Sequence, residues 1–156
     1  MSKIAELTDA YLAGVGELRA AVAGMTREQL TARPVPGKWS TLEVVAHLAD
    51  FDPVYAERMK RVIALERPSL LGADESLFAR SLAYQERDPE EEFALMDLTR
   101  KQMARILRTL PDSALERVGV HNERGEKTLA DLLTGVVDHV RSHLPHVHEK
   151  RKALGL

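Results

Sequence analysis

Three histidines lie close together near the end of the chain, in the segment DHVRSHLPHV at residues 138–147. His139 and His143 are four positions apart, and because an α-helix turns about 100° per residue, their side chains point the same way. Leu132 and Val136 share that direction, so a helix here would turn both histidines toward the protein core. Buried imidazoles need partners for their ring nitrogens, and a divalent cation satisfies one nitrogen of each ring. The pair indicates half of a metal site, although core histidines with ordinary hydrogen bonds can have the same spacing.

A third histidine lies in the segment STLEVVAHLADFDPV at residues 40–54, which has the pattern of another helix. Val44, Leu48 and Phe51 lie on the same arc as His47, so this histidine also faces inward. Three neutral imidazoles leave coordination positions open on zinc or nickel, which is typical of a catalytic rather than a structural metal. His47, His139 and His143 are therefore the predicted ligands of one divalent metal ion.

The elements that must position these histidines are helices. Apolar residues recur at steps of three and four along four long segments. No segment shows the sustained alternation of a β-strand, and aromatic residues make up only 4% of the chain. The sequence therefore predicts an all-α fold, a four-helix bundle formed by a single domain over residues 1–156. The expected helices cover residues 2–25, 41–65, 89–110 and 129–154, with a defect in the second near Pro53.

Two connections are long enough to contribute to a site. Residues 66–88 are polar and mixed, and we expect a crossover with one helical piece at about residues 75–85. The segment RVGVHNERGEK at residues 117–127 contains two glycines and is expected to form a loop that includes His121.

Composition excludes several classes of function. The net charge of −2 gives no electrostatic basis for binding nucleic acid or an anionic membrane. No apolar run is long enough to span a bilayer, and the first residues lack the pattern of a secretory signal. The absence of cysteine excludes disulfides, thiolate ligands and a cysteine nucleophile. We therefore expect a cytoplasmic protein that acts on a small molecule.

Two segments carry a family resemblance. GKWSTLEVVAHLAD, at residues 37–50, resembles the W-[ST]-x-x-E-x-x-x-H-L segment of the DinB-like superfamily. GVHNERGEKTLADLLTGVVDHVRSHLPHV, at residues 119–147, resembles its closing loop and H-x-x-x-H helix. The resemblance implies an up-down-down-up bundle with the long crossover between helices two and three. It also implies a homodimer, with nickel or zinc held by His47, His139 and His143.

The members of that superfamily suggest what the metal does. They include thiol S-transferases, a thiol-dependent isomerase and proteins described as metal-dependent hydrolases. The resemblance thus implies an enzyme that activates a small nucleophile on the metal, and we expect a low-molecular-weight thiol cosubstrate first and water second. A metal-binding or stress-response module without turnover is the alternative. The residues of the chain do not identify a catalytic side chain.

Four further residues are candidates for the surroundings of the metal. Asp50 and Glu43 lie at the edge of the inward arc and are expected to orient His47 through its free ring N–H. Trp39 is expected to anchor the start of its helix, with substrate stacking as the alternative. The superfamily often has glutamine where this chain has His146, which follows a helix-bending proline. We expect His146 at the rim of the site, with a fourth ligand as the alternative.

Overall fold

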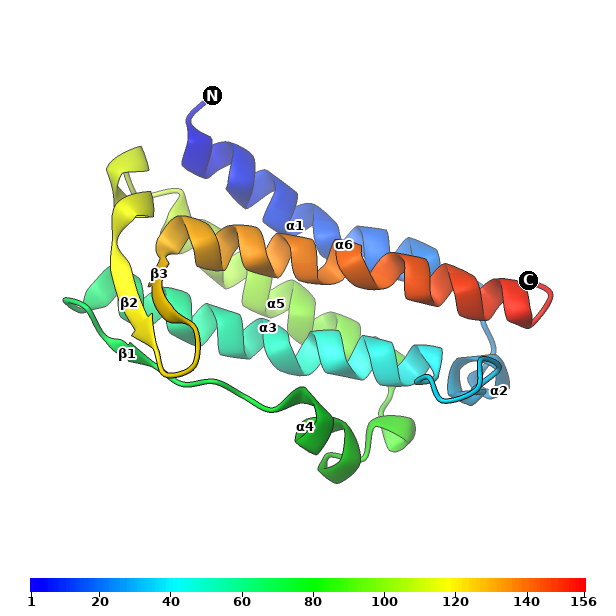
Figure 1. The fold of residues 1–156 in the computed structure, drawn as a ribbon. Coiled ribbons are helices and arrows are strands. Elements are labelled where there is room, and N and C mark those ends of the chain that lie inside the picture. Colours follow the sequence, from blue (N-terminus) through cyan, green and yellow to red (C-terminus); the bar gives the residue numbers. More distant parts are fainter.

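The computed structural model describes residues 1–156, and four long helices form its body (Figure 1). α1 and α6 run in one direction and α3 and α5 in the other, so the bundle is up-down-down-up. Each of α1 and α3 packs against both α5 and α6. The fold expected from the sequence is confirmed. The bounds are α1 Lys3–Ala21, α3 Thr41–Ala64, α5 Pro89–Leu107 and α6 Leu129–Ala153.

The helices begin where the sequence supplies side chains that satisfy free backbone N–H groups. Ser40 caps α3 by accepting from the Glu43 N–H, and Thr128 caps α6 by accepting from the Asp131 N–H. Asp88 caps α5, in which proline occupies the first turn. A short helix, α2 (Arg27–Thr31), follows α1 and is capped by Thr26 in the same way. These caps account for the close agreement between the expected and observed helix starts.

The crossover between α3 and α5 runs back along the length of the bundle (Figure 1). It contains α4 (Glu75–Ser81) and a 3₁₀ turn, η1 (Tyr84–Glu86). The single helical piece expected at residues 75–85 is therefore two pieces. Ala83 separates them because its left-handed backbone, with φ of 53°, cannot continue a right-handed helix.

A small sheet closes one end of the bundle, where only a loop was expected. β2 (Val118–His121) pairs with β3 (Gly125–Thr128) in an antiparallel hairpin, and β1 (Ser69–Leu70) pairs with β2 in parallel. A 3₁₀ turn, η2 (Asp112–Glu116), precedes the hairpin. These strands are too short for an alternating pattern to stand out in the sequence. The loop prediction was therefore wrong, and His121 is the buried last residue of β2.

Both internal prolines lie inside continuous helices. α3 extends past Pro53 and α6 extends past Pro145, so the defect expected near Pro53 does not divide α3. Proline removes one N–H donor from a helix but still adopts helical φ. Packing of the two helices along their length thus outweighs the lost hydrogen bonds.

A buried ion pair joins three of the long helices. Arg100 of α5 donates to both carboxylate oxygens of Asp52 on α3, at 2.6 and 2.8 Å. It also donates to the backbone carbonyl of Tyr11 on α1. Asp52 and Arg100 are each only 1% exposed, and two clusters of apolar side chains form most of the interior. None of the helices combines the length and the apolar character that a bilayer span requires.

Candidate metal centre

The structure brings three histidines from two helices together. His47 comes from α3, while His139 and His143 come from successive turns of α6. One ring nitrogen from each lies within 4.8 Å of the others. The Nε2 atoms of His47 and His139 are 2.8 Å apart. The three residues selected from helical spacing therefore form one cluster.

Aromatic rings surround this three-histidine cluster. The Trp39 and Phe51 rings lie 5.2 and 4.9 Å from the ring of His47, measured between centroids. Tyr55 lies 6.0 Å from His139 in the same measure. His47 has no exposed surface, whereas His139 is partly exposed. The surrounding rings restrict the movement of the imidazoles and keep water from the inner side of the cluster.

Burial keeps the three imidazoles neutral. Burial, together with the smaller effect of the neighbouring His139 and His143, lowers the pKa of His47 to about 3. Burial and adjacent positive charge likewise lower the pKa of both His139 and His143 to about 4. Each ring therefore retains a lone pair at neutral pH, which is the state that binds a metal ion.

The donor set fits a divalent cation. Two Nε2 atoms only 2.8 Å apart need a positive bridge, which is either a shared proton or a cation. If the two rings share a proton, the Nδ1 atom of one ring carries a hydrogen and the Nδ1 atom of the other has a free lone pair. Both Nδ1 atoms are buried and have no hydrogen-bond partner in the chain. A tetrahedral zinc ion with Zn–N bonds of about 2.0–2.1 Å places its nitrogens roughly 3.3 Å apart. The His47–His139 pair would need to open by about 0.5 Å, and nitrogen atoms up to 4.8 Å apart would need to move closer together.

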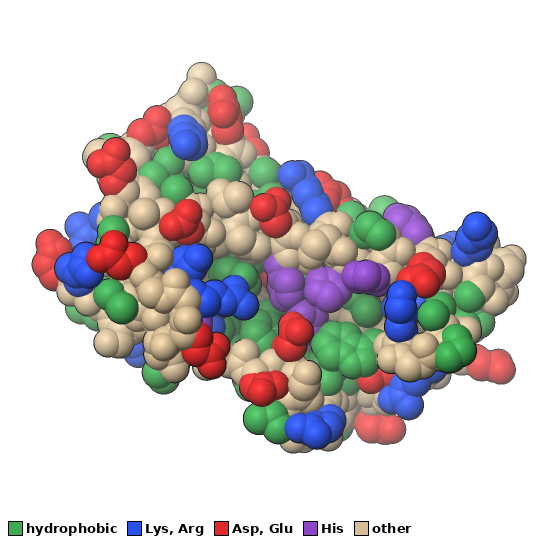
Figure 2. Space-filling view, in the orientation of Figure 1, with side chains coloured by type: hydrophobic (Ala, Val, Ile, Leu, Met, Phe, Trp, Pro, Cys, Tyr) green, Lys and Arg blue, Asp and Glu red, His purple; other side chains and the backbone are tan.

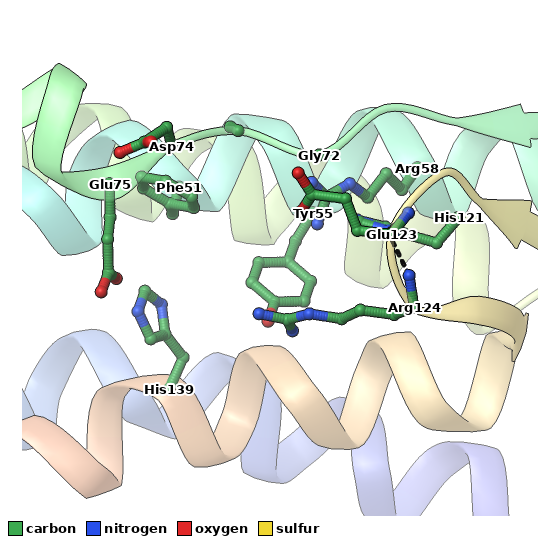
Figure 3. Close-up of a pocket in the computed structure, with 11 residues that line it drawn as sticks. Phe51, Tyr55, Arg58, Gly72, Asp74, Glu75, His121, Glu123, Arg124 and His139 are labelled. Carbon is green, nitrogen blue, oxygen red and sulfur yellow. Dashed lines mark hydrogen bonds between the residues drawn. The ribbon is translucent and has the colours of Figure 1, made fainter.

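An acidic residue from the crossover also faces the cluster, and sequence reasoning missed it. A carboxylate oxygen of Glu75, on α4, is 3.7 Å from Nε2 of His47. Figure 3 shows this side chain extending from α4 toward His139. Glu75 is one of many acids in a polar segment, and only the folded crossover brings it here. No sequence pattern distinguishes it.

Glu43 and Asp50 are engaged away from the cluster. Glu43 accepts from Arg33 Nε at 2.7 Å and from the Ser40 backbone N–H at 3.1 Å. Asp50 forms a two-pronged ion pair with Arg87, at 3.0 and 3.1 Å. Neither contacts His47, whose Nδ1 has no partner. The geometry thus does not support the orienting role expected for these carboxylates, because guanidinium groups hold them instead.

The two remaining candidates lie beside the cluster. Trp39 packs against His47 and meets the ring of Tyr84 edge-on, with centroids 6.4 Å apart. His146 is exposed, and its ring centroid is 5.6 Å from that of His143. His146 is not among the residues whose nitrogens converge. His146 therefore lies beside the cluster, and its role at the rim of a metal site stays a prediction.

Cavities open on both sides of the cluster. One, of about 340 Å³, reaches His139 and is lined in part by Phe51, Tyr55 and Glu75. The other, of about 310 Å³, reaches His143 and His146 and is lined in part by Trp39 and Lys150. Figure 2 shows the histidines at the middle of this face, with basic side chains to one side and acidic ones close by. A metal ion held here would be accessible to small molecules.

Known proteins resemble this chain over most of its length. A Bacillus licheniformis protein is 30% identical over 139 residues, which cover 88% of this chain and 79% of the relative. YfiT of Bacillus subtilis is 30% identical over 140 residues, which cover 89% of this chain and 79% of YfiT. Both are named as putative metal-dependent hydrolases.

The fold has a counterpart among solved structures. The structure of Bacillus subtilis YfiT matches with a TM-score of 0.90 and 27% identity, covering 99% of this chain and 90% of YfiT. It is described as a "probable metal-dependent hydrolase with an unusual four-helix bundle topology". The family model of the DinB superfamily matches residues 11–147, which include all three clustered histidines. The shared topology, the relatives and the family match together show that this chain belongs to the DinB superfamily.

Proposed function

We propose that this protein binds one divalent metal ion through His47, His139 and His143 and is a metal-dependent enzyme acting on a small molecule. The observation that carries the proposal is the convergence of three neutral, largely buried imidazoles between two open cavities. A structural site is normally closed by a fourth protein ligand, and the nitrogen cluster has three members. Nickel and zinc both suit such a set of imidazole donors.

A divalent cation in this position supplies Lewis acidity that lowers the pKa of a water molecule or a thiol at neutral pH. The three histidines are uncharged, so they leave the charge of the cation undiminished. The Trp39 and Phe51 rings shield His47 on its inner side. The Glu75 carboxylate extends to within 3.7 Å of the cluster and is placed to accept a proton from a nucleophile in the cavity beside His139.

Water and a thiol are both compatible nucleophiles. The names of the relatives favour water, which reverses the order expected from the sequence. Since the chain has no cysteine, a thiol would have to enter as a cosubstrate. We therefore propose hydrolysis first and thiol transfer second.

Metal content tests the binding proposal. Protein purified without chelator should contain close to one nickel or zinc ion per chain by elemental analysis. His143→Ala should lose most of this metal because only two of the three proposed ligands remain. His148→Ala is the matched control, since this histidine is exposed on the same helix and lies outside the cluster. Full metal retention by His143→Ala would contradict the assignment.

Turnover tests the enzymatic part. Metal-loaded wild type and His47→Ala should be compared on small esters and amides, and on an electrophile with each common cellular thiol. Metal-dependent hydrolysis in wild type alone is the expected result. If metal binds but no reaction depends on it, the non-catalytic metal-binding module becomes the better account.

A further inference from the structure

The cavity beside His139 contains a buried positive charge that is not held in an ion pair. Arg58 of α3 lines it and is only 6% exposed. Its Nε and Nη2 atoms both donate to the backbone carbonyl of Leu71, at 3.1 and 2.7 Å. No carboxylate lies within ion-pair distance, and the Nη1 atom makes no hydrogen bond. A guanidinium buried in this way is costly unless an anion accompanies it.

A second guanidinium enters the same cavity from the hairpin. Arg124 lies in the turn between β2 and β3 and forms no ion pair within the chain. Figure 3 shows its side chain extending from the turn toward Tyr55 and the side of α6 that carries His139. Arg58 and Arg124 are close enough for the charge of Arg124 to lower the pKa of Arg58, after the larger effect of burial. Two like charges in one cavity make an anionic ligand more favourable still.

His121 adds a neutral donor between them. Its Nδ1 accepts from the backbone N–H groups of Glu123 and Arg124, at 3.1 and 3.2 Å. Burial, with Arg58 and Arg124 nearby, lowers the pKa of His121, which favours the neutral ring. A neutral ring that accepts at Nδ1 carries its proton on Nε2, which is therefore a donor. His121 lines this cavity, so its Nε2–H is available to a bound oxyanion.

The acidic residues of the cavity form no ion pair with Arg58 or Arg124, although Glu123 lies near enough to offset part of the charge by raising the pKa of Arg58. Asp74 accepts from the Leu77 N–H and caps α4. Glu75 faces the three-histidine cluster. Glu123 lies against Gly72, where a Cβ atom would come within 2.8 Å of its Oε2, and it pairs with neither arginine. The cavity is thus polarised, with metal-binding imidazoles at one end and free cationic donors at the other.

We propose that Arg58, Arg124 and His121 form an oxyanion-binding subsite, so that the substrate is a small molecule bearing a carboxylate or phosphate group. Paired guanidinium groups are the preferred partners of such groups. The claim about the substrate rests on the proposed enzymatic function, whereas anion binding does not require a bound metal. The anionic group would anchor the molecule while its reactive group extends toward His139.

Nuclear magnetic resonance titration tests the subsite directly. The backbone amide signals of Gly72 and Arg124 should be followed while succinate, inorganic phosphate or the neutral succinamide is added. Each titration should be run on the protein as purified and again after a chelator has removed bound metal. At least one anion should cause saturable shifts in both samples, and succinamide should cause none. The stronger of the two anions identifies the preferred group. Absence of saturable shifts with both anions would overturn the inference.

Arg124→Gln supplies the matched variant. The Arg124 side chain is exposed, and Arg124 contacts His121 only through a hydrogen bond from its backbone N–H. The variant should therefore retain the fold. Anion affinity should fall by at least tenfold. Arg61→Gln removes the same charge from the outer face of α3, where Arg61 pairs with Glu57, and should bind as wild type does. Equal affinity in Arg124→Gln and wild type would refute the subsite, whether or not the metal proposal stands.

Discussion

Replacing Gly14 of α1 by alanine adds one methyl group and tests the Asp52–Arg100 ion pair that joins three of the long helices. A Cβ atom at this position would lie 2.5 Å from Nη1 of Arg100. That guanidinium cannot move aside at low cost, because Asp52 holds it at 2.6 and 2.8 Å and it is 1% exposed. Gly14→Ala should therefore displace Arg100 and leave Asp52 buried without its partner.

The magnitude follows from two opposing effects. Replacing glycine by alanine inside a helix stabilises it by roughly 0.5–1 kcal/mol. Breaking a buried ion pair costs about 3–5 kcal/mol, because the remaining charge stays desolvated. Gly14→Ala should thus lower the free energy of unfolding by about 2–4 kcal/mol. For a chain of this size, the melting temperature should fall by roughly 5–15 °C.

Gly16→Ala is the control on the same helix. A Cβ atom at Gly16 meets nothing within 4 Å, so this variant should show only the gain in helix propensity. Both variants and wild type should be compared by urea unfolding, followed by circular dichroism, and by thermal melting. If Gly14→Ala is as stable as Gly16→Ala, Arg100 does not need its observed position, and the reasoning fails.

Three other outcomes are expected. His146→Gln should leave metal affinity within a few-fold of wild type, because His146 lies outside the nitrogen cluster, and a loss of orders of magnitude would make it a ligand. Burial raises the pKa of Glu43, but hydrogen bonds from Arg33 and Ser40 outweigh this and leave the pKa below the ordinary 4.5. Glu43→Gln should therefore be less stable than wild type at pH 7, and urea unfolding should show the difference shrinking as the pH falls below about 4.5. Sedimentation at micromolar concentration should show a homodimer, and a monomer would contradict that expectation.

The convergence of the three histidines could be predicted because a helix fixes side-chain direction. Once His139 and His143 were assigned to one helix, their shared face followed from their spacing. Flanking apolar residues then gave the inward direction, and the same reasoning applied to His47. The caps at Ser40 and Thr128 also fixed where the two helices begin. Helical spacing and capping preferences were sufficient to predict these features because each depends on residues within two turns of one helix.

The surroundings of the three-histidine cluster could not be predicted in the same way. Glu43 and Asp50 lie near His47 along α3, but arginines from other segments, Arg33 and Arg87, compete for their carboxylates. Glu75 reaches the cluster only because the crossover folds back over α3. Such partners depend on tertiary packing, and a charged residue in a polar segment carries no signal of which partner it will meet.

The residues of the candidate site come from two kinds of element, the long helices and the connections between them, and we infer different roles for the two. The three clustered histidines come from the long helices α3 and α6. The Asp52–Arg100 pair ties α3 to α5 about one and a half turns beyond His47. Metal ligands need positions accurate to a few tenths of an ångström, which packed helices can maintain. Glu75 and Arg124, in contrast, come from the crossover and the hairpin. We expect changes in those connections to alter what the cavity presents to a small molecule without moving the three clustered histidines. Substitution of Arg124 should therefore change substrate preference, and substitution of Glu75 should lower turnover, while metal content stays constant in both; parallel loss of metal would show that the connections also shape the metal centre.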